Sequence, residues 1–116
     1  MKIKKYFRMA KLIAYQGDAK NAKRQHRLGA VGLRNDGVIV GASNLCNRNI
    51  CPEAHAEFRT CNMITPNSVI FVVRINRKDE FVMAKPCQSC QRYMKVKGVR
   101  RCYYSTDDGY GVIKFN

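Results

Sequence analysis

The amino-acid sequence predicts an α/β fold, a three-layer α/β/α sandwich around a mixed five-stranded sheet, in one domain spanning residues 1–116. Residues 69–75 form a continuous apolar run, which is typical of a strand buried on both faces. Segments with helical spacing of apolar residues are interleaved with strand-like segments, as in layered α/β folds. A chain of 116 residues has room for one hydrophobic core and little room for a second module.

The first third of the chain predicts a helix followed by a hairpin. Residues 3–15 form the helix, with apolar residues near helical spacing at Ile3, Phe7, Ala10 and Ala14. Residues 28–34 and 38–43 read as strands, and Asn35-Asp36-Gly37 between them is a strong tight-turn signal.

The rest of the chain supplies two more helices and the remaining strands. A helix is expected over about residues 54–64, with Pro52 near its start. After the buried run, residues 76–80 predict a turn and residues 81–84 a short strand. Pro86 begins the third helix, and Gly98 is its C-terminal cap. Two strands, 101–105 and 112–115, are expected to run antiparallel, with Tyr110 in the turn between them.

The composition indicates a folded protein with a strongly basic surface. Hydrophobic residues make up 46% of the chain, and the formal net charge is +14, which attracts polyanions and phosphate-bearing ligands. No apolar run approaches the roughly 18 residues of a membrane span, and lysines interrupt any signal-peptide core, so we expect no membrane partner. A C-x-x-C pair beside a histidine motif fits metal ligands in a reducing, cytoplasmic setting better than a disulfide framework.

The most specific feature is His55-Ala56-Glu57 followed by Pro86-Cys87-Gln88-Ser89-Cys90. His55, Cys87 and Cys90 supply three zinc ligands, which leaves a fourth tetrahedral position open for water, as in catalytic zinc sites. Glu57 need not ligate and stands two residues from the histidine. The pattern H-x-E followed by P-C-x-x-C is the signature of zinc-dependent nucleobase deaminases.

The chemistry of that pattern is hydrolytic deamination. The reaction needs a nucleophile at neutral pH, which zinc provides by lowering the pKa of water, and a group that carries protons to the base, which is Glu57. Two alternatives remain: Cys87 and Cys90 as a redox pair, or a structural zinc with Cys51 or Cys61 as a further ligand. Neither alternative uses the upstream H-x-E.

On these residues the sequence resembles the cytidine/deoxycytidylate deaminase superfamily over nearly its whole length. Residues 26–31 resemble the first core strand of that superfamily, and 98–104 resemble its third helix exit and fourth strand. The resemblance implies zinc bound by His55, Cys87 and Cys90, with Glu57 as proton shuttle. It also implies a substrate pocket, to which we assign Asn44, the backbone of Ala30 and Ala56, and Tyr104.

Several functions follow from this resemblance, and the first is deamination of cytosine to uracil in a cytosine nucleotide such as dCMP. Arg24, Arg27 and Arg48 are then phosphate-binding candidates. The alternative is deamination of cytosine in single-stranded DNA or RNA, or of adenosine in RNA, with residues 20–27 and the first helix along the backbone. A third is a non-catalytic zinc-stabilised binding module, against which Glu57 argues. Association into a homo-oligomer is also compatible with a domain of this kind.

Overall fold

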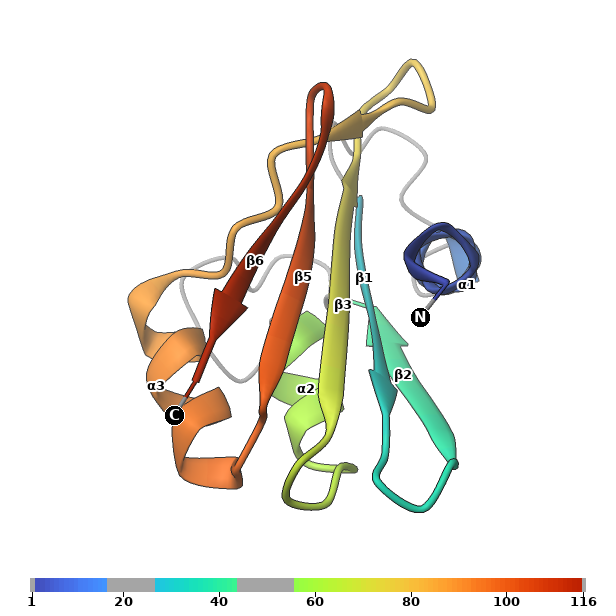
Figure 1. Ribbon diagram of the computed structural model, residues 1–116. Coiled ribbons are helices and arrows are strands. Elements are labelled where there is room, and N and C mark those ends of the chain that lie inside the picture. The colour runs from blue at the N-terminus through green and yellow to red at the C-terminus, as the bar shows by residue number, and fades with distance from the viewer. Residues whose placement is uncertain (1, 17–26, 44–55, 116) are drawn as a thin grey trace.

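The computed structural model describes residues 2–16, 27–43 and 56–115, in which a mixed β-sheet is covered by helices on both faces (Figure 1). The elements in chain order are α1 (Ile3–Gln16), β1 (Arg27–Leu33), β2 (Ile39–Ser43), α2 (Ala56–Cys61), β3 (Val69–Ile75), β4 (Phe81–Val82), α3 (Gln88–Lys97), β5 (Arg101–Thr106) and β6 (Gly109–Lys114). Helix α1 lies on one face of the sheet, and α2 and α3 lie on the other. The three-layer α/β/α fold predicted from the sequence is confirmed.

The sheet has six strands, so the prediction of five strands is wrong. Its strand order is β2-β1-β3-β5-β6, and β4 pairs with β3 outside this path. The parallel pair of β3 and β5 ends at Val72, which leaves the same edge of β3 open at Arg74 and Ile75. Strand β4 pairs there, and the buried Ser105 joins it to the sheet because its hydroxyl donates to the Val82 carbonyl oxygen at 2.7 Å.

Strand β3 is the centre of the core. Side chains at its odd positions belong to the cluster under α1, and Ile70 and Val72 belong to the cluster under α2 and α3. Phe71 is stacked between Tyr6 and Tyr103, with ring centroids 4.7 Å and 5.4 Å away. The expectation of a strand buried on both faces is therefore confirmed.

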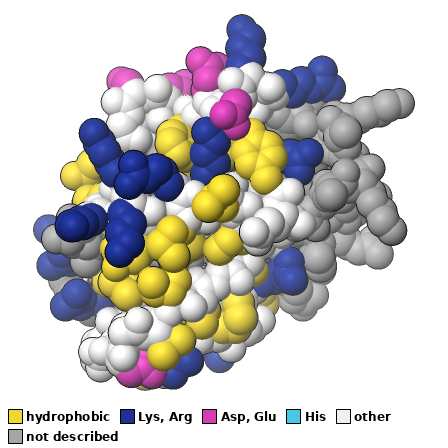
Figure 2. All heavy atoms as spheres, turned by 90° about the vertical axis from the view of Figure 1, so that its right-hand side faces the viewer, with side chains coloured by type: hydrophobic (Ala, Val, Ile, Leu, Met, Phe, Trp, Pro, Cys, Tyr) yellow, Lys and Arg dark blue, Asp and Glu magenta, His cyan; other side chains and the backbone are white. Residues whose placement is uncertain are grey.

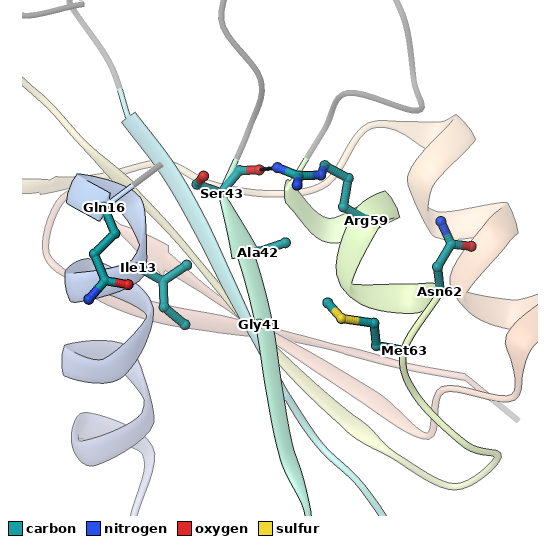
Figure 3. Close-up of a pocket in the computed structure, with 8 residues that line it drawn as sticks. All are labelled: Ile13, Gln16, Gly41, Ala42, Ser43, Arg59, Asn62 and Met63. Atoms are coloured by element: carbon teal, nitrogen blue, oxygen red, sulfur yellow. Dashed lines mark hydrogen bonds between the residues drawn. The ribbon is translucent and has the colours of Figure 1, made fainter. Parts of the chain in front are cut away.

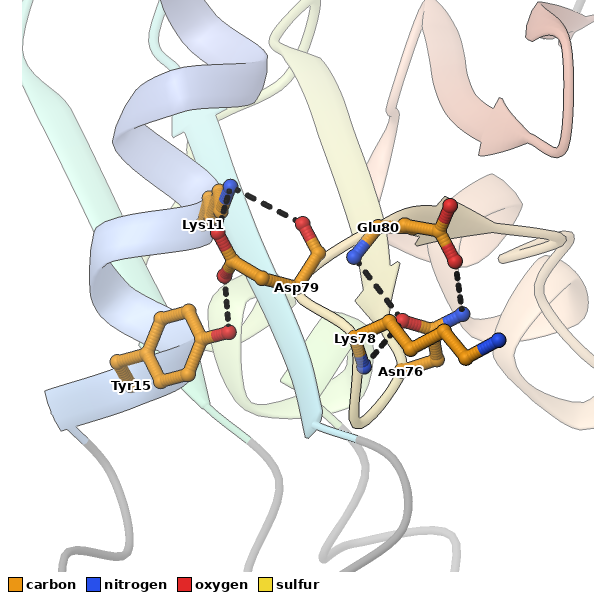
Figure 4. Close-up of polar contacts among 6 residues, drawn as sticks. All are labelled: Lys11, Tyr15, Asn76, Lys78, Asp79 and Glu80. Atoms are coloured by element: carbon orange, nitrogen blue, oxygen red, sulfur yellow. Dashed lines mark hydrogen bonds and ion pairs between the residues drawn. The ribbon is translucent and has the colours of Figure 1, made fainter.

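Helix α1 packs closely on β1 because the residues between them are small. Ala10 and Ala14 are buried, and a Cβ atom at Gly29 would overlap the carbonyl oxygen of Ala10. The turn between β3 and β4 also docks on this helix: Asp79 accepts hydrogen bonds from the Lys11 ammonium at 3.0 Å and from the Tyr15 hydroxyl (Figure 4).

The main differences from the predicted element boundaries are in β4, α2, α3 and β6. Strand β4 ends at Val82, two residues before its predicted end at residue 84. Helix α2 ends at Cys61 because Met63 N–H bonds to Thr60, which closes a turn where the helix was expected to continue to residue 64. Helix α3 begins at Gln88, two residues after Pro86, and ends as predicted at Gly98, whose φ of 84° is the left-handed conformation of a helix cap. Strands β5 and β6 are joined at a tight turn, so Tyr110 lies in β6 and not in a turn.

The described segments contain no helix with the length and apolar character needed to cross a membrane.

Candidate active site

Glu57 lies in the first turn of α2 and is only 4% exposed. The neighbouring Ala56 is fully buried, so the start of α2 is embedded in the core and not presented to solvent. A carboxylate is rarely buried to this extent unless it has a specific role or partner. Glu57 is the one charged side chain in the buried set of the described residues, which makes it the most distinctive group on this face of the sheet.

The two cysteines of the C-x-x-C segment lie at the start of α3. Cys87 is the N-cap residue with an extended backbone, and its carbonyl oxygen accepts the Gln91 N–H at 2.9 Å. The Gln91 side chain donates to the Pro86 carbonyl oxygen at 2.8 Å, which fixes the chain entering the helix. Cys87 is exposed and Cys90, three residues later, is fully buried, so the pair extends from the surface into the core.

Glu57 and Cys90 influence each other electrostatically. Burial is the main cause that raises the pKa of the Cys90 thiol far above its ordinary value, and the negative charge of Glu57 adds to it. Burial and then Glu57 likewise raise the pKa of Cys61 to about 12 and that of Cys102 above its ordinary value. The negative charge of Glu57 therefore opposes ionisation of three buried thiols, on α2, α3 and β5.

The donor atoms at this site suit zinc. Cys87 and Cys90 offer two soft ligands. The negative charge of Glu57 opposes ionisation of the Cys90 thiol, and a bound cation would compensate this negative charge. In the ranges 2–16, 27–43 and 56–115, no three His, Cys, Asp or Glu side chains group closely enough to hold a metal ion. Two cysteines need a further ligand, and the predicted one, His55, lies outside the described residues.

An aromatic pair holds α2 against α3 beside these groups. The rings of Phe58 and Tyr93 are stacked with centroids 3.9 Å apart and an interplanar angle of 8°. The Tyr93 hydroxyl also donates to the side-chain oxygen of Asn62, just after α2 ends. Phe58 follows Glu57 and Tyr93 lies one helical turn after Cys90, so this stack sets the spacing between the two candidate groups.

Arg59 connects α2 to the end of β2. Its guanidinium donates to the Ser43 carbonyl oxygen at 2.5 Å (Figure 3). Ser43 directly precedes Asn44, which was predicted to contact substrate and lies outside the described residues. A cavity of about 430 Å³ opens beside this contact, between α1, β2 and α2. None of the residues predicted for the site lines it, so we do not assign it to the substrate.

The remaining predicted substrate residues lie on both faces of the sheet. Ala30 and Ala56 are buried in one cluster on the α2–α3 face, against which Tyr104 is partly buried. The ring of Tyr104 also covers Gly111 of β6, which is ordinary strand packing. Arg27 is on the opposite face, with its guanidinium 5.1 Å above the ring of Tyr15, and is not brought near Glu57.

The sequence interpretation did not find Phe58, Arg59 and Tyr93. The only signal for the aromatic pair is that each ring stands within one helical turn of a motif residue, at Glu57 and at Cys90. No signal in the sequence indicates that Arg59 binds a backbone carbonyl.

Comparison with known proteins decides the family. The sequence matches the model of the cytidine and deoxycytidylate deaminase zinc-binding region over residues 1–106. The chain belongs to this family. It is accordingly a zinc-dependent hydrolase that breaks the C–N bond of an amino-bearing nucleobase, and the resemblance stated from the sequence is confirmed.

Solved structures agree on the fold of this deaminase. Cytidine deaminase from Burkholderia pseudomallei superposes with a TM-score of 0.68 and 21% identity, covering 98% of this chain and 93% of that chain. Cytidine deaminase from Mycobacterium leprae gives 0.62 and 17%, covering 97% and 93%, and that from Mycobacterium tuberculosis gives 0.54 and 17%, covering 90% and 87%. No curated protein sequence matches the chain.

Proposed function

We propose that this enzyme converts cytosine to uracil in a cytosine nucleotide of the dCMP type, releasing ammonia, with Glu57 as the proton shuttle. The observation that carries the proposal is the buried carboxylate of Glu57 beside Cys90, at the start of two helices that the Phe58–Tyr93 stack holds together. His55, Cys87 and Cys90 would hold the zinc ion. Zinc lowers the pKa of a coordinated water from 15.7 to about 7, which makes hydrolysis feasible at neutral pH.

Glu57 supplies the proton transfers that the reaction requires. Its carboxylate takes one proton from the water as the water oxygen bonds to C4, and delivers that proton to N3 of the cytosine ring. It then takes the remaining proton of the hydroxyl group at C4 and passes it to the amino nitrogen. The C4–N bond breaks, ammonia leaves, and the oxygen at C4 becomes the carbonyl oxygen of uracil. Burial of Glu57 keeps bulk water from competing for these protons.

A nucleotide is preferred to a free nucleoside for two reasons. The histidine in H-A-E resembles the deoxycytidylate and polynucleotide branches of the superfamily, and a net charge of +14 favours a ligand that carries phosphate. Arg24 and Arg48, which lie outside the described residues, stay candidates for the phosphate. Arg27 does not, because it lies on the α1 face.

A second candidate substrate is cytosine in a single strand of DNA or RNA. The distribution of charge supports it. Helices α1 and α3 contain no acidic residue, whereas the described acidic residues other than Glu57 all lie in turns, at Asp36, Asp79, Glu80, Asp107 and Asp108. Figure 2, which faces the α1 side, shows many Lys and Arg side chains, with Asp and Glu side chains near its upper and lower ends.

Side-by-side incubation of the zinc-loaded enzyme with cytidine, dCMP, dCTP and a cytosine-containing oligonucleotide tests the proposal. We expect uracil to form fastest from dCMP, as measured by liquid chromatography of the bases. Exclusive reaction of the oligonucleotide would replace the first candidate by the second, and reaction of none would refute both.

Glu57→Gln tests the mechanism separately from the substrate. We expect zinc content to be unchanged and turnover to fall about 10²- to 10⁴-fold, since a neutral amide cannot shuttle protons. The zinc-free variant should be at least as stable as the zinc-free parent, because a buried carboxylate has been removed. Normal turnover in Glu57→Gln would show that another group carries the protons.

A further inference from the structure

We propose that the groove between α1, β4 and the β5–β6 turn binds a nucleotide of single-stranded nucleic acid, with its base against Tyr110 and its phosphate near Lys4 and Arg8. We call it the α1 groove. It has a volume of about 430 Å³ and a mainly apolar lining that includes Ile3, Phe7 and Phe81. The groove opens on the α1 side of the sheet, opposite Glu57, so the inference goes beyond the deamination reaction.

Tyr110 offers an aromatic surface for a base. The residue is 55% exposed, yet its ring contacts Phe7 and Tyr103 edge-on, with centroids 6.2 Å and 6.0 Å away. These contacts fix the orientation of the ring while leaving much of the residue open to the groove. Aromatic side chains of this kind bind single-stranded nucleic acid by stacking, largely irrespective of base identity.

The helix side of the groove suits a phosphate. Lys4 and Arg8 both line it and are four residues apart, which places them on the same side of α1. Glu80 and Asp107 line the groove from outside α1 and balance these two charges, so the excess of positive charge comes from α1 as a whole, which has four basic residues and no acidic one. Both carboxylates accept hydrogen bonds from the protein. Glu80 accepts from the Asn76 amide nitrogen at 3.1 Å, and Asp107 accepts from the Met83 backbone N–H at 3.2 Å.

The walls of the groove are preformed. Asp79 fastens the β3–β4 turn to Lys11 and Tyr15 of α1, immediately before the wall that Phe81 provides (Figure 4). The Lys11 ammonium lies 5.5 Å from the centre of the Phe81 ring. Binding of a ligand therefore requires little reorganisation of the groove.

A fluorescently labelled oligothymidylate of about 15 nucleotides is a suitable probe. Thymine has no exocyclic amino group, so deamination does not contribute to the signal. We expect anisotropy titrations to show binding that Tyr110→Leu weakens about tenfold and Tyr110→Phe leaves unchanged, because phenylalanine keeps the stacking ring. Thermal unfolding of both variants checks that the fold is retained.

Removal of the two cations tests the phosphate contact. The pair Lys4→Gln and Arg8→Gln should reduce the slope of log K against log salt concentration by about 1.4, since each lost contact to a single strand contributes about 0.7. The pair Lys95→Gln and Arg100→Gln removes the same charge from exposed positions on α3 and before β5, and should leave the slope nearly unchanged. Equal reductions for the two pairs would overturn the proposal in favour of a diffuse electrostatic attraction.

Failure of this proposal is distinguishable from failure of the proposed function. Deamination of dCMP by the groove variants reports on the active site, and oligothymidylate affinity reports on the groove. Affinity that Tyr110→Leu leaves intact would refute the groove whatever the enzyme deaminates. If the groove variants change the sedimentation coefficient of the free protein but keep the parent's affinity for oligothymidylate, the groove is a contact between copies of this chain. That result also refutes the proposal.

Discussion

Replacing Tyr93 tests whether the aromatic stack between α2 and α3 sets the geometry of the active site. Tyr93 contacts Phe58 with ring centroids 3.9 Å apart and donates a hydrogen bond to Asn62. Both partners belong to α2 or to the turn that follows it. Tyr93→Phe removes the hydrogen bond and keeps the stack, whereas Tyr93→Leu removes both.

The expected loss of stability is modest. A single solvent-exposed hydrogen bond contributes about 0.5 kcal/mol, so Tyr93→Phe should reduce the free energy of unfolding by about that amount. Tyr93→Leu loses in addition an aromatic pair of about 0.5–1.5 kcal/mol, for a total of about 1–2 kcal/mol. Activity should fall further than these values imply, because Glu57 and Cys90 lie next to the stacked rings and a shift of about 1 Å can cost 10²-fold in rate.

The assay compares urea unfolding with kcat/KM on the best cytosine substrate and with zinc affinity. Tyr6→Leu is the matched control, because Tyr6 stacks on Phe71 at 4.7 Å on the opposite face of the sheet. We expect Tyr6→Leu to cost a similar free energy of unfolding and to leave kcat/KM and zinc affinity unchanged under conditions where the protein stays folded.

Two outcomes would refute this reasoning. If Tyr93→Leu is destabilised by 1–2 kcal/mol but keeps full activity and zinc affinity, the stack contributes to stability and does not position the site. If Tyr6→Leu loses as much activity as Tyr93→Leu, the effect comes from general loss of stability.

Two further predictions concern ionisable groups. Hydrogen bonds from Tyr15 and then Lys11 hold the pKa of Asp79 below its ordinary value, so their stabilisation is present above about pH 4 and is lost as the pH falls through the folded-state pKa. Melting temperatures of Asp79→Asn should therefore converge with those of the parent at low pH, and a gap that persists there would contradict this. Burial and then Glu57 raise the pKa of Cys61 to about 12, so its thiol stays protonated near pH 8. Alkylation mapped by mass spectrometry should be much slower at Cys61 than at the exposed Cys87 in zinc-free protein, and comparable rates would contradict the burial of Cys61.

The sequence predicts most of the fold because the central signals are local. Residues 69–75 are apolar throughout, and a strand with this composition must be covered on both sides, which requires helices on two faces. Strand β4 is harder to place, because it is two residues long and its pairing depends on where β5 leaves the edge of β3. That geometry is set by distant residues and is not encoded in residues 81–84.

The candidate site is predicted only as far as its motif residues. Glu57, Cys87 and Cys90 follow from spacing and chemistry, but the Phe58–Tyr93 stack joins two helices whose packing no local pattern specifies. For Arg27, the prediction of a phosphate-binding role overlooked the alternation of side chains along a strand. Strand alternation places it on the same side as Val31, under α1, and the period of two alone was sufficient to separate it from the active-site face.

The burial of Glu57 links the candidate site to the stability of the fold. Burying a carboxylate costs stability unless hydrogen bonds or an opposite charge compensate it, and the charge of Glu57 also opposes ionisation of Cys61, Cys90 and Cys102. The packing around such a group helps to offset the part of the cost that its polar interactions leave. Fully buried Val72 of the central strand and Met94 of α3 provide this packing on the same face. The central strand and the third helix therefore contribute to the stability that lets a small domain keep the Glu57 side chain in its core.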